Sequence, residues 1–151
     1  MIKNYRNPIA YLSNELLRIV GNDLVSIVIF GSRARKNYNE SSDIDVMMVL
    51  ENQNFNEKAL SKLRKDYLLK TGISLDLHIF SKEEIIANFN DFSPLFLTLL
   101  LGKIILFDKE MFFHDLYKNF IKRMINQNIR YCEGGKIWEL NKIAESLEAL
   151  Q

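Results

Sequence analysis

The chain has 151 residues, of which 48% are hydrophobic and 26% are charged, so it is long enough for one folded domain and is not a disordered protein. Lysine and arginine total 20 against 19 acidic residues, which argues against a protein whose main role is to coat nucleic acid or an anionic membrane, although a local basic face stays open. A single cysteine and two histidines exclude a disulfide framework and a cysteine or histidine zinc cluster, so any metal is expected on oxygen ligands, as Mg²⁺ or Mn²⁺.

The first helix is predicted to begin at Asn7-Pro8, an N-cap residue followed by proline, and to end at Gly21. The amino-terminal segment is too polar for a signal peptide, and we expect a cytoplasmic protein with no membrane partner. The apolar run Leu24–Phe30 predicts a buried strand. The polar, basic segment 31–42 predicts a loop with room for a short helical piece, and Asp43–Leu50 predicts a second strand.

The middle of the chain alternates helical and strand patterns. A helix is expected over Glu57–Lys70, with Gly72 ending it, and the alternation in Ile73–Phe80 predicts a third strand. Ser81 to Glu84 spells a capping box that opens a short helix. The run Leu95–Phe107 is too short to cross a bilayer and is interpreted as a buried helix, closed by Gly102, followed by a buried strand.

From Lys109 onward the pattern predicts helices only. One apolar stripe comprises Phe112, Leu116, Phe120 and Met124; Gly134-Gly135 interrupts it, and a second stripe comprises Ile137, Leu140, Ala144 and Leu147. The simplest interpretation is that both helices cover the domain's own core. The alternative is that the helix over Ile137–Leu150 binds a partner or a second copy of the chain.

Three carboxylates are candidates for one site. Asp43 and Asp45 lie two residues apart on a strand, so their side chains project from the same face. Asp76 lies on the face of the third strand opposite its aliphatic row, together with His78. If these strands are neighbours, the acids converge, and such crowded charges raise one another's pKa values unless cations lie among them.

A phosphate-binding element is expected directly upstream. Gly31 allows a phosphate to approach the backbone, and the Ser32 hydroxyl can hold a phosphate oxygen. Arg33 and Arg35 are candidates for steadying a triphosphate, with Lys36 nearby. The simpler alternative is that these arginines are solvated loop charges.

The segment GSRARKNYNESSDIDVMMVL resembles the signature of the DNA-polymerase-beta-type nucleotidyltransferase superfamily. Gly-Ser follows a strand, ten residues intervene, and Asp43-Ile44-Asp45 follows; Asp76 in LDLHIF matches the third family carboxylate. The small size resembles the minimal nucleotidyltransferases, which include antitoxins encoded beside HEPN-type toxins. The resemblance covers roughly Ile9 to Asp108.

The resemblance implies an α/β (α+β) fold: a small mixed β-sheet with helices on one face in residues 1–108, and a C-terminal helical extension, residues 109–151, packed on it. It implies that Asp43 and Asp45 hold two metal ions, that Asp76 holds the catalytic metal and helps to deprotonate the acceptor, and that Gly31 and Ser32 bind the β- and γ-phosphates. Lys36 departs from the pattern, because the family often has glycine after the Ala-Arg pair.

The resemblance also implies a magnesium-dependent enzyme, with Mn²⁺ as an alternative ion, that moves a nucleoside monophosphate from ATP or another nucleoside triphosphate to an acceptor. The acceptor is expected to be a protein, with a HEPN toxin as the favoured case, or RNA. Formation of homo- or hetero-oligomers through the C-terminal helices stays an open alternative. Two alternatives are a non-catalytic module that occludes a partner and a small-molecule adenylyltransferase of the aminoglycoside type. His78 is expected to be a wall residue beside the metals.

Overall fold

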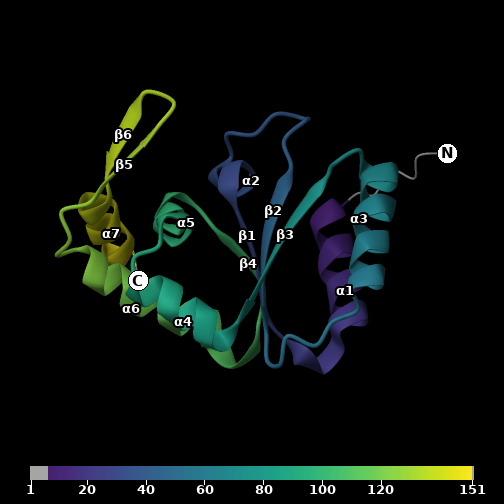
Figure 1. Cartoon of the computed structure of the whole chain (residues 1–151). Coiled ribbons are helices and arrows are strands. Elements are labelled where there is room, and N and C mark those ends of the chain that lie inside the picture. Colours follow the sequence, from purple (N-terminus) through teal and green to yellow (C-terminus); the bar gives the residue numbers. More distant parts are fainter. Residues whose placement is uncertain (1–6, 151) are drawn as a thin grey trace.

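The computed structural model describes residues 7–150, in which a central sheet is flanked by helices on both sides (Figure 1). The first six residues of the predicted range 1–108, and Gln151, lie outside the described residues. The strands are β1 (Leu24–Phe30), β2 (Ile44–Leu50), β3 (Leu75–Ser81), β4 (Ile104–Asp108), β5 (Arg130–Glu133) and β6 (Lys136–Glu139).

The helices agree closely with the predicted starts and ends in the first two thirds of the chain. They are α1 (Pro8–Val20), η1 (Gly21–Asp23), α2 (Gly31–Arg35), α3 (Glu57–Thr71), α4 (Lys82–Asn90), α5 (Pro94–Leu97), η2 (Thr98–Leu101), η3 (Lys109–Met111), α6 (Phe112–Met124) and α7 (Leu140–Ala149). The Asn7 side chain caps α1, and Ser81 and Glu84 form the predicted capping box at α4.

The main sheet is mixed and has the strand order β3-β2-β1-β4. β1 runs antiparallel to both β2 and β4, whereas β2 and β3 are parallel neighbours. The register of the parallel pair places Asp45 of β2 directly beside Asp76 of β3. The predicted α/β class with a small mixed sheet is therefore confirmed, and the two strands that carry the candidate acids are adjacent.

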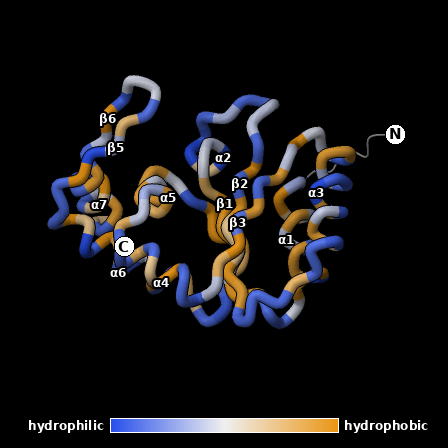
Figure 2. Tube along the Cα trace, in the orientation of Figure 1, coloured by the Kyte–Doolittle hydropathy of each residue, from blue (hydrophilic) through white to orange (hydrophobic). Residues whose placement is uncertain are grey.

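Helices cover both faces of the sheet, and the predicted arrangement with helices on one face is wrong in this detail. α1 and α3 pack on one face, while α4, α5 and α6 cover the other, and α7 packs against α6 on its outer side (Figure 1). The reason lies in β1, which is buried at all seven positions and therefore needs apolar cover on each side. The hydropathy view shows the apolar residues concentrated along these central strands (Figure 2).

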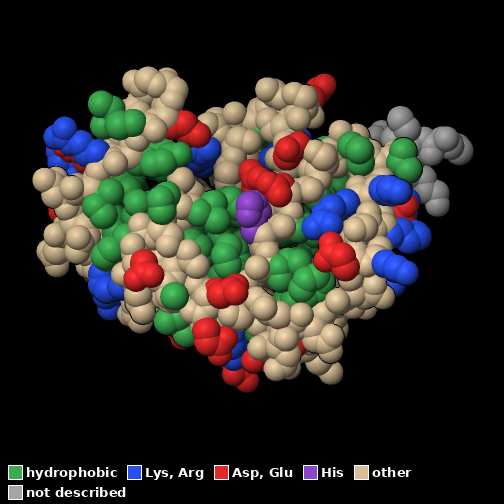
Figure 3. Space-filling view, in the orientation of Figure 1, with side chains coloured by type: hydrophobic (Ala, Val, Ile, Leu, Met, Phe, Trp, Pro, Cys, Tyr) green, Lys and Arg blue, Asp and Glu red, His purple; other side chains and the backbone are tan. Residues whose placement is uncertain are grey.

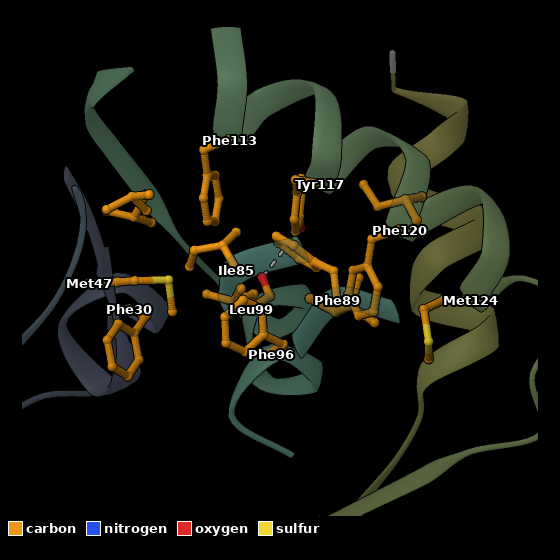
Figure 4. Packing of buried hydrophobic residues seen from close by; sticks show 14 of the residues in the cluster. Phe30, Met47, Ile85, Phe89, Phe96, Leu99, Phe113, Tyr117, Phe120 and Met124 are labelled. Carbon is orange, nitrogen blue, oxygen red and sulfur yellow. Dashed lines mark hydrogen bonds between the residues drawn. The ribbon is translucent and has the colours of Figure 1, made fainter. Parts of the chain in front are cut away.

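An aromatic cluster joins the C-terminal helices to the sheet (Figure 4). Phe89 of α4 lies with its ring centroid 4.8 Å from that of Phe96 and 5.0 Å from that of Phe120 in α6. The buried Tyr117 hydroxyl donates a hydrogen bond to the Leu99 carbonyl. The segment after Lys109 thus shares one continuous core with the sheet, because removing these large rings from water stabilises the joined parts together.

The prediction that the chain is purely helical after Lys109 is wrong. β5 and β6 form an antiparallel hairpin in which Tyr131 pairs with Trp138, and Gly134-Gly135 is its turn. Both glycines have positive φ, 56° and 79°, as a two-residue hairpin turn requires. The predicted second stripe therefore begins in a strand at Ile137 and continues in α7, where Leu140 and Ala144 are buried.

Among residues 7–150, none of the helices combines the length and apolar character that spanning a membrane would require. The run Leu95–Phe107 forms the short helices α5 and η2 and then β4, as predicted, but β4 is half-buried and not buried as expected.

Candidate active site

The candidate acids lie at the end of the sheet where β2 and β3 begin. Asp45 is the second residue of β2 and Asp76 the second residue of β3, and the two are register partners. Their side chains project toward the face covered by α4 and α6, because Met47, two residues after Asp45, belongs to the core on that face. The structure thus brings Asp45 and Asp76 together.

His78 joins these two acids. One ligand atom from each of Asp45, Asp76 and His78 can be chosen so that all three lie within 4.8 Å of one another. His78 Nε2 is 3.2 Å from Asp76 Oδ2, and its ring meets Phe30 edge to face, with centroids 5.2 Å apart. In the space-filling view, acidic side chains lie beside a histidine near the middle of one face, next to an apolar surface (Figure 3).

Asp43 is placed differently from the other two acids. It lies one residue before β2, is exposed, and its Oδ1 accepts a hydrogen bond from the Ser74 hydroxyl. It is close enough for its charge to contribute to the raised pKa of Asp45, but it is not part of the compact group with His78. The three predicted acids therefore share one end of the sheet, with Asp43 held toward the start of β3.

The electrostatics of Asp45 fit a site that takes a cation. Burial is the largest cause of its raised pKa, and the negative charge of Asp76 is the next. A divalent ion between the two carboxylates would reverse both effects, since it would replace lost water and neutralise the repulsion. Carboxylate oxygens are also the ligands that Mg²⁺ and Mn²⁺ prefer, so the donor set fits such an ion.

Gly31 lies directly against the Asp45 carboxylate. A Cβ atom at position 31 would lie 2.2 Å from Asp45 Oδ2, and the residue has a φ of 71°. The carboxylate therefore rests directly against the backbone that opens α2. Ser32 is the next residue of that helix, so the predicted phosphate-binding pair Gly31-Ser32 is adjacent to the acids.

The predicted phosphate-binding arginines both have protein partners. The Arg33 guanidinium donates to the Ser42 carbonyl, with Nη2 at 2.9 Å, and lies 4.3 Å from the centroid of the Tyr38 ring. Arg35 Nη1 donates to Glu133 Oε2 at 2.7 Å, and its buried Nε has no hydrogen-bond partner among the described residues. Arg33 thus holds the loop before β2, and Arg35 joins α2 to the β5–β6 hairpin.

Lys36 has a left-handed backbone conformation, with a φ of 61°, at the C-cap of α2. Glycine adopts this conformation without strain, which gives a physical reason why glycine is common at this place in the resembling family.

A cavity of about 700 Å³ lies on the other face of the sheet, on the side covered by α1. Its lining includes Ile29, Ile44 and Arg33, but none of Asp45, Asp76 and His78. Asp45, Asp76 and His78 therefore lie on the face of the sheet opposite to this cavity. The candidate site is formed by these three residues and not by the cavity.

One feature of the site is missed by the sequence predictions. Glu133, the partner of Arg35, belongs to the hairpin, which the paired glycines at 134 and 135 could have indicated. His78 is predicted as a wall residue on the strand face that it shares with Asp76, and the structure places its imidazole in one compact group with Asp45 and Asp76.

Comparison with known proteins gives a family match and several similar proteins. The family model described as "Nucleotidyltransferase domain" matches residues 9–101. A protein of Methanocaldococcus jannaschii named "Putative protein adenylyltransferase" is 27% identical over 108 residues, which cover 69% of each chain.

Two solved structures share the fold at low identity. A chain of a toxin–antitoxin complex with AMP-PNP has a TM-score of 0.51 and 18% identity, over 78% of this chain and 86% of that one. Spectinomycin adenyltransferase from Enterococcus faecialis, solved with ATP and spectinomycin, has a TM-score of 0.52 and 11% identity, over 82% of this chain and 68% of that one.

Proposed function

This chain belongs to the nucleotidyltransferase domain family, and on that premise we propose that it transfers AMP from ATP to a protein acceptor. The predicted family and the predicted class of enzyme are confirmed by the match over residues 9–101. The donor, the acceptor and the residue roles are our proposal. The observation that carries it is the pairing of Asp45 with Asp76, with the Asp45 carboxylate lying against Gly31 at the start of α2.

In the proposed site, Asp43, Asp45 and Asp76 would hold the divalent cations, with two Mg²⁺ ions as the starting assumption. The ions would neutralise charge that develops on the phosphates during transfer. Gly31 and Ser32 would bind the β- and γ-phosphates, since the glycine leaves the backbone accessible and the hydroxyl can donate a hydrogen bond. Arg33 and Arg35 remain candidates for phosphate binding only if their bonds to Ser42 and Glu133 open.

The transfer itself needs one proton acceptor. An oxygen of the acceptor hydroxyl attacks the α-phosphorus, the bond to the bridging oxygen breaks, and pyrophosphate leaves with its electron pair. Asp76 is suited to take the hydroxyl proton on a carboxylate oxygen, because its side chain is 57% exposed and accessible to an incoming acceptor.

Two comparisons support a protein acceptor. The M. jannaschii relative is named as a protein adenylyltransferase, and the toxin–antitoxin chain with AMP-PNP has the same fold. We therefore propose a toxin as the acceptor, with this chain as the neutralising partner and with contacts that include the C-terminal helices.

Co-expression with the product of a neighbouring gene tests this proposal. Mass spectrometry should show the partner heavier by whole adenylate units, and label should be transferred from α-labelled but not from γ-labelled ATP. Asp45→Asn and Asp76→Asn should abolish the mass increase. Asp66→Asn, which changes a half-exposed acid paired with Lys62 on α3, should not. An increase that persists in the first two variants, or label from the γ-phosphate, contradicts the proposal.

A small-molecule acceptor is the second candidate, because the spectinomycin enzyme matches at a similar TM-score. Incubation with α-labelled ATP and a panel of aminocyclitols and aminoglycosides separates the two. Labelling of a small molecule and of no protein would favour this second function. A module that only occludes a partner would label neither and would have no need of ATP.

A further inference from the structure

His78 is the one member of the compact group that is not a carboxylate. It lies on β3 two residues after Asp76, so both side chains project from the same face of the strand. Its side chain is 32% exposed, which leaves the imidazole accessible from the site. Phe30, which is 4% exposed, packs edge to face against the ring and restricts its orientation.

The distances in this group suit ligands of a single ion. Two neighbouring ligands of an octahedral ion with bonds of about 2.1 Å lie about 3 Å apart, and opposite ligands lie about 4.2 Å apart. His78 Nε2 and Asp76 Oδ2 are separated by 3.2 Å, and the Asp45 atom completes a set within 4.8 Å. Small side-chain movements would therefore bring all three atoms onto one ion.

Asp43 does not complete this set. Its carboxylate accepts a hydrogen bond from Ser74, at the end of the loop that leads into β3. Among the described residues, the compact group around Asp45 and Asp76 has the His78 imidazole as its third member. A cation bound there is therefore offered a nitrogen ligand as well as carboxylate oxygens.

We propose that His78 is a nitrogen ligand of a divalent cation shared with Asp45 and Asp76, and that the site therefore selects Mn²⁺ over Mg²⁺. Both ions bind carboxylate oxygens, but Mn²⁺, as a transition-metal ion, accepts an imidazole nitrogen more readily than Mg²⁺, which demands oxygen ligands and retains its water. The inference rests on the proposed function only in placing a metal at this end of the sheet. The proposed function assumes two Mg²⁺ ions that are bound by carboxylates alone. For one of these ions, the present inference replaces that assumption.

Electron paramagnetic resonance of Mn²⁺ tests the ligand directly. The purified full chain with Mn²⁺ should show a nitrogen hyperfine coupling in pulsed spectra, and the coupling should change to that of ¹⁵N in protein grown with ¹⁵N-histidine. His78→Gln should abolish the coupling, and His114→Gln, which changes the only other histidine of the chain, should leave it intact.

Metal titration tests the selectivity. The six-line spectrum of free Mn²⁺ measures how much of the ion is bound, and competition with Mg²⁺ gives the affinity for Mg²⁺. The wild-type chain should bind Mn²⁺ at least about tenfold more tightly than Mg²⁺. His78→Ala should weaken Mn²⁺ binding by about tenfold or more and Mg²⁺ binding by less than about threefold. Asp45→Asn should weaken the binding of both Mn²⁺ and Mg²⁺.

Bound Mn²⁺ without a histidine nitrogen coupling, or equal Mn²⁺ affinity in wild type and His78→Ala, would overturn the inference. The proposed function survives that result if AMP transfer is still observed. Conversely, a nitrogen coupling in a protein that adenylates no partner supports the metal site and contradicts the proposed function, so the two failures are distinguishable.

Discussion

At the scale of single residues, the site contains a carboxylate pair and backbone conformations that lower the stability of the folded chain. Asp45 is partly buried beside Asp76, and this raises its pKa. Gly31 has a positive φ and no room for a side chain, and Lys36 has a backbone conformation that suits glycine. Such local costs are expected where a protein arranges groups for binding rather than for stability.

Replacement of Asp45 should stabilise the chain in the absence of divalent cations. A carboxyl with a raised folded-state pKa stabilises the fold only when protonated, and it costs stability at pH values above that pKa. At pH 7 with a chelator, Asp45→Asn should raise the melting temperature by roughly 2–4 °C. The gain should shrink as the pH falls through the raised pKa of Asp45 and should be lost below the ordinary aspartate pKa. A lower melting temperature at pH 7 contradicts the account.

Alanine at position 31 should be costly because of Asp45. Gly31→Ala should lower the free energy of unfolding by about 2 kcal/mol or more, measured by urea denaturation. Gly72→Ala is the matched control, because Gly72 has a similar φ of 74° but open space around it; about 1 kcal/mol is expected there. In an Asp45→Ala background the cost of Gly31→Ala should fall toward that of the control. Equal costs in both backgrounds would show that the contact is unimportant.

Glycine at position 36 should stabilise the chain. Lys36→Gly removes the cost of a left-handed lysine and should raise the free energy of unfolding by about 0.5–1 kcal/mol. Lys65→Gly, in the middle of α3, should instead lower it by about 1 kcal/mol. Chemical denaturation of both variants checks the opposite signs, and a loss of stability in Lys36→Gly disagrees with the structure.

At the scale of elements, the predictable parts are those with local causes. The starts of α1 and α4 follow from capping residues, and β3 follows from strict alternation. The hairpin is missed because Ile137, Leu140 and Ala144 happen to be spaced as in a helix, although Ile137 lies in β6. The two glycines were interpreted as a break, whereas their positive φ values make a two-residue turn.

The site is predictable to the extent that it depends on strand adjacency. Asp45 and Asp76 meet because β2 and β3 pair in register, as the alternation of both strands allows. The bond between Arg35 and Glu133 joins residues 98 apart in the chain, so no local pattern indicates it. Likewise, the turn of Asp43 toward Ser74 depends on the exact course of the loop before β3.

The bond between Arg35 and Glu133 should matter for the hairpin more than for the whole fold. Glu133→Gln should change the free energy of unfolding by less than about 1 kcal/mol, because the glutamate is 48% exposed. Amide hydrogen exchange in β5 and β6 should nevertheless become faster, since this bond joins the hairpin to α2. Lys136→Gln, on the opposite strand, is the control. Unchanged exchange in Glu133→Gln would mean that other contacts hold the hairpin.

At the scale of the whole molecule, the sheet is a platform that presents the acids at one end, and helices on both faces keep it rigid. The aromatic cluster of α4, α5 and α6 fixes the C-terminal helices to the same core that supports β1 and β2 (Figure 4). This architecture places the Gly31-Ser32 turn, the paired acids and His78 within one small region. We expect this region to bind a nucleoside triphosphate together with a divalent cation before any transfer takes place.

Calorimetric titration with ATP tests this central claim most directly, since it needs no acceptor. Wild-type protein should bind ATP in the presence of Mg²⁺ or Mn²⁺ and only weakly with a chelator. The Asp45→Asn/Asp76→Asn double variant, folded by circular dichroism, should lose the metal-dependent binding. ATP binding that is equally tight in the double variant, or independent of divalent cations, would contradict the account.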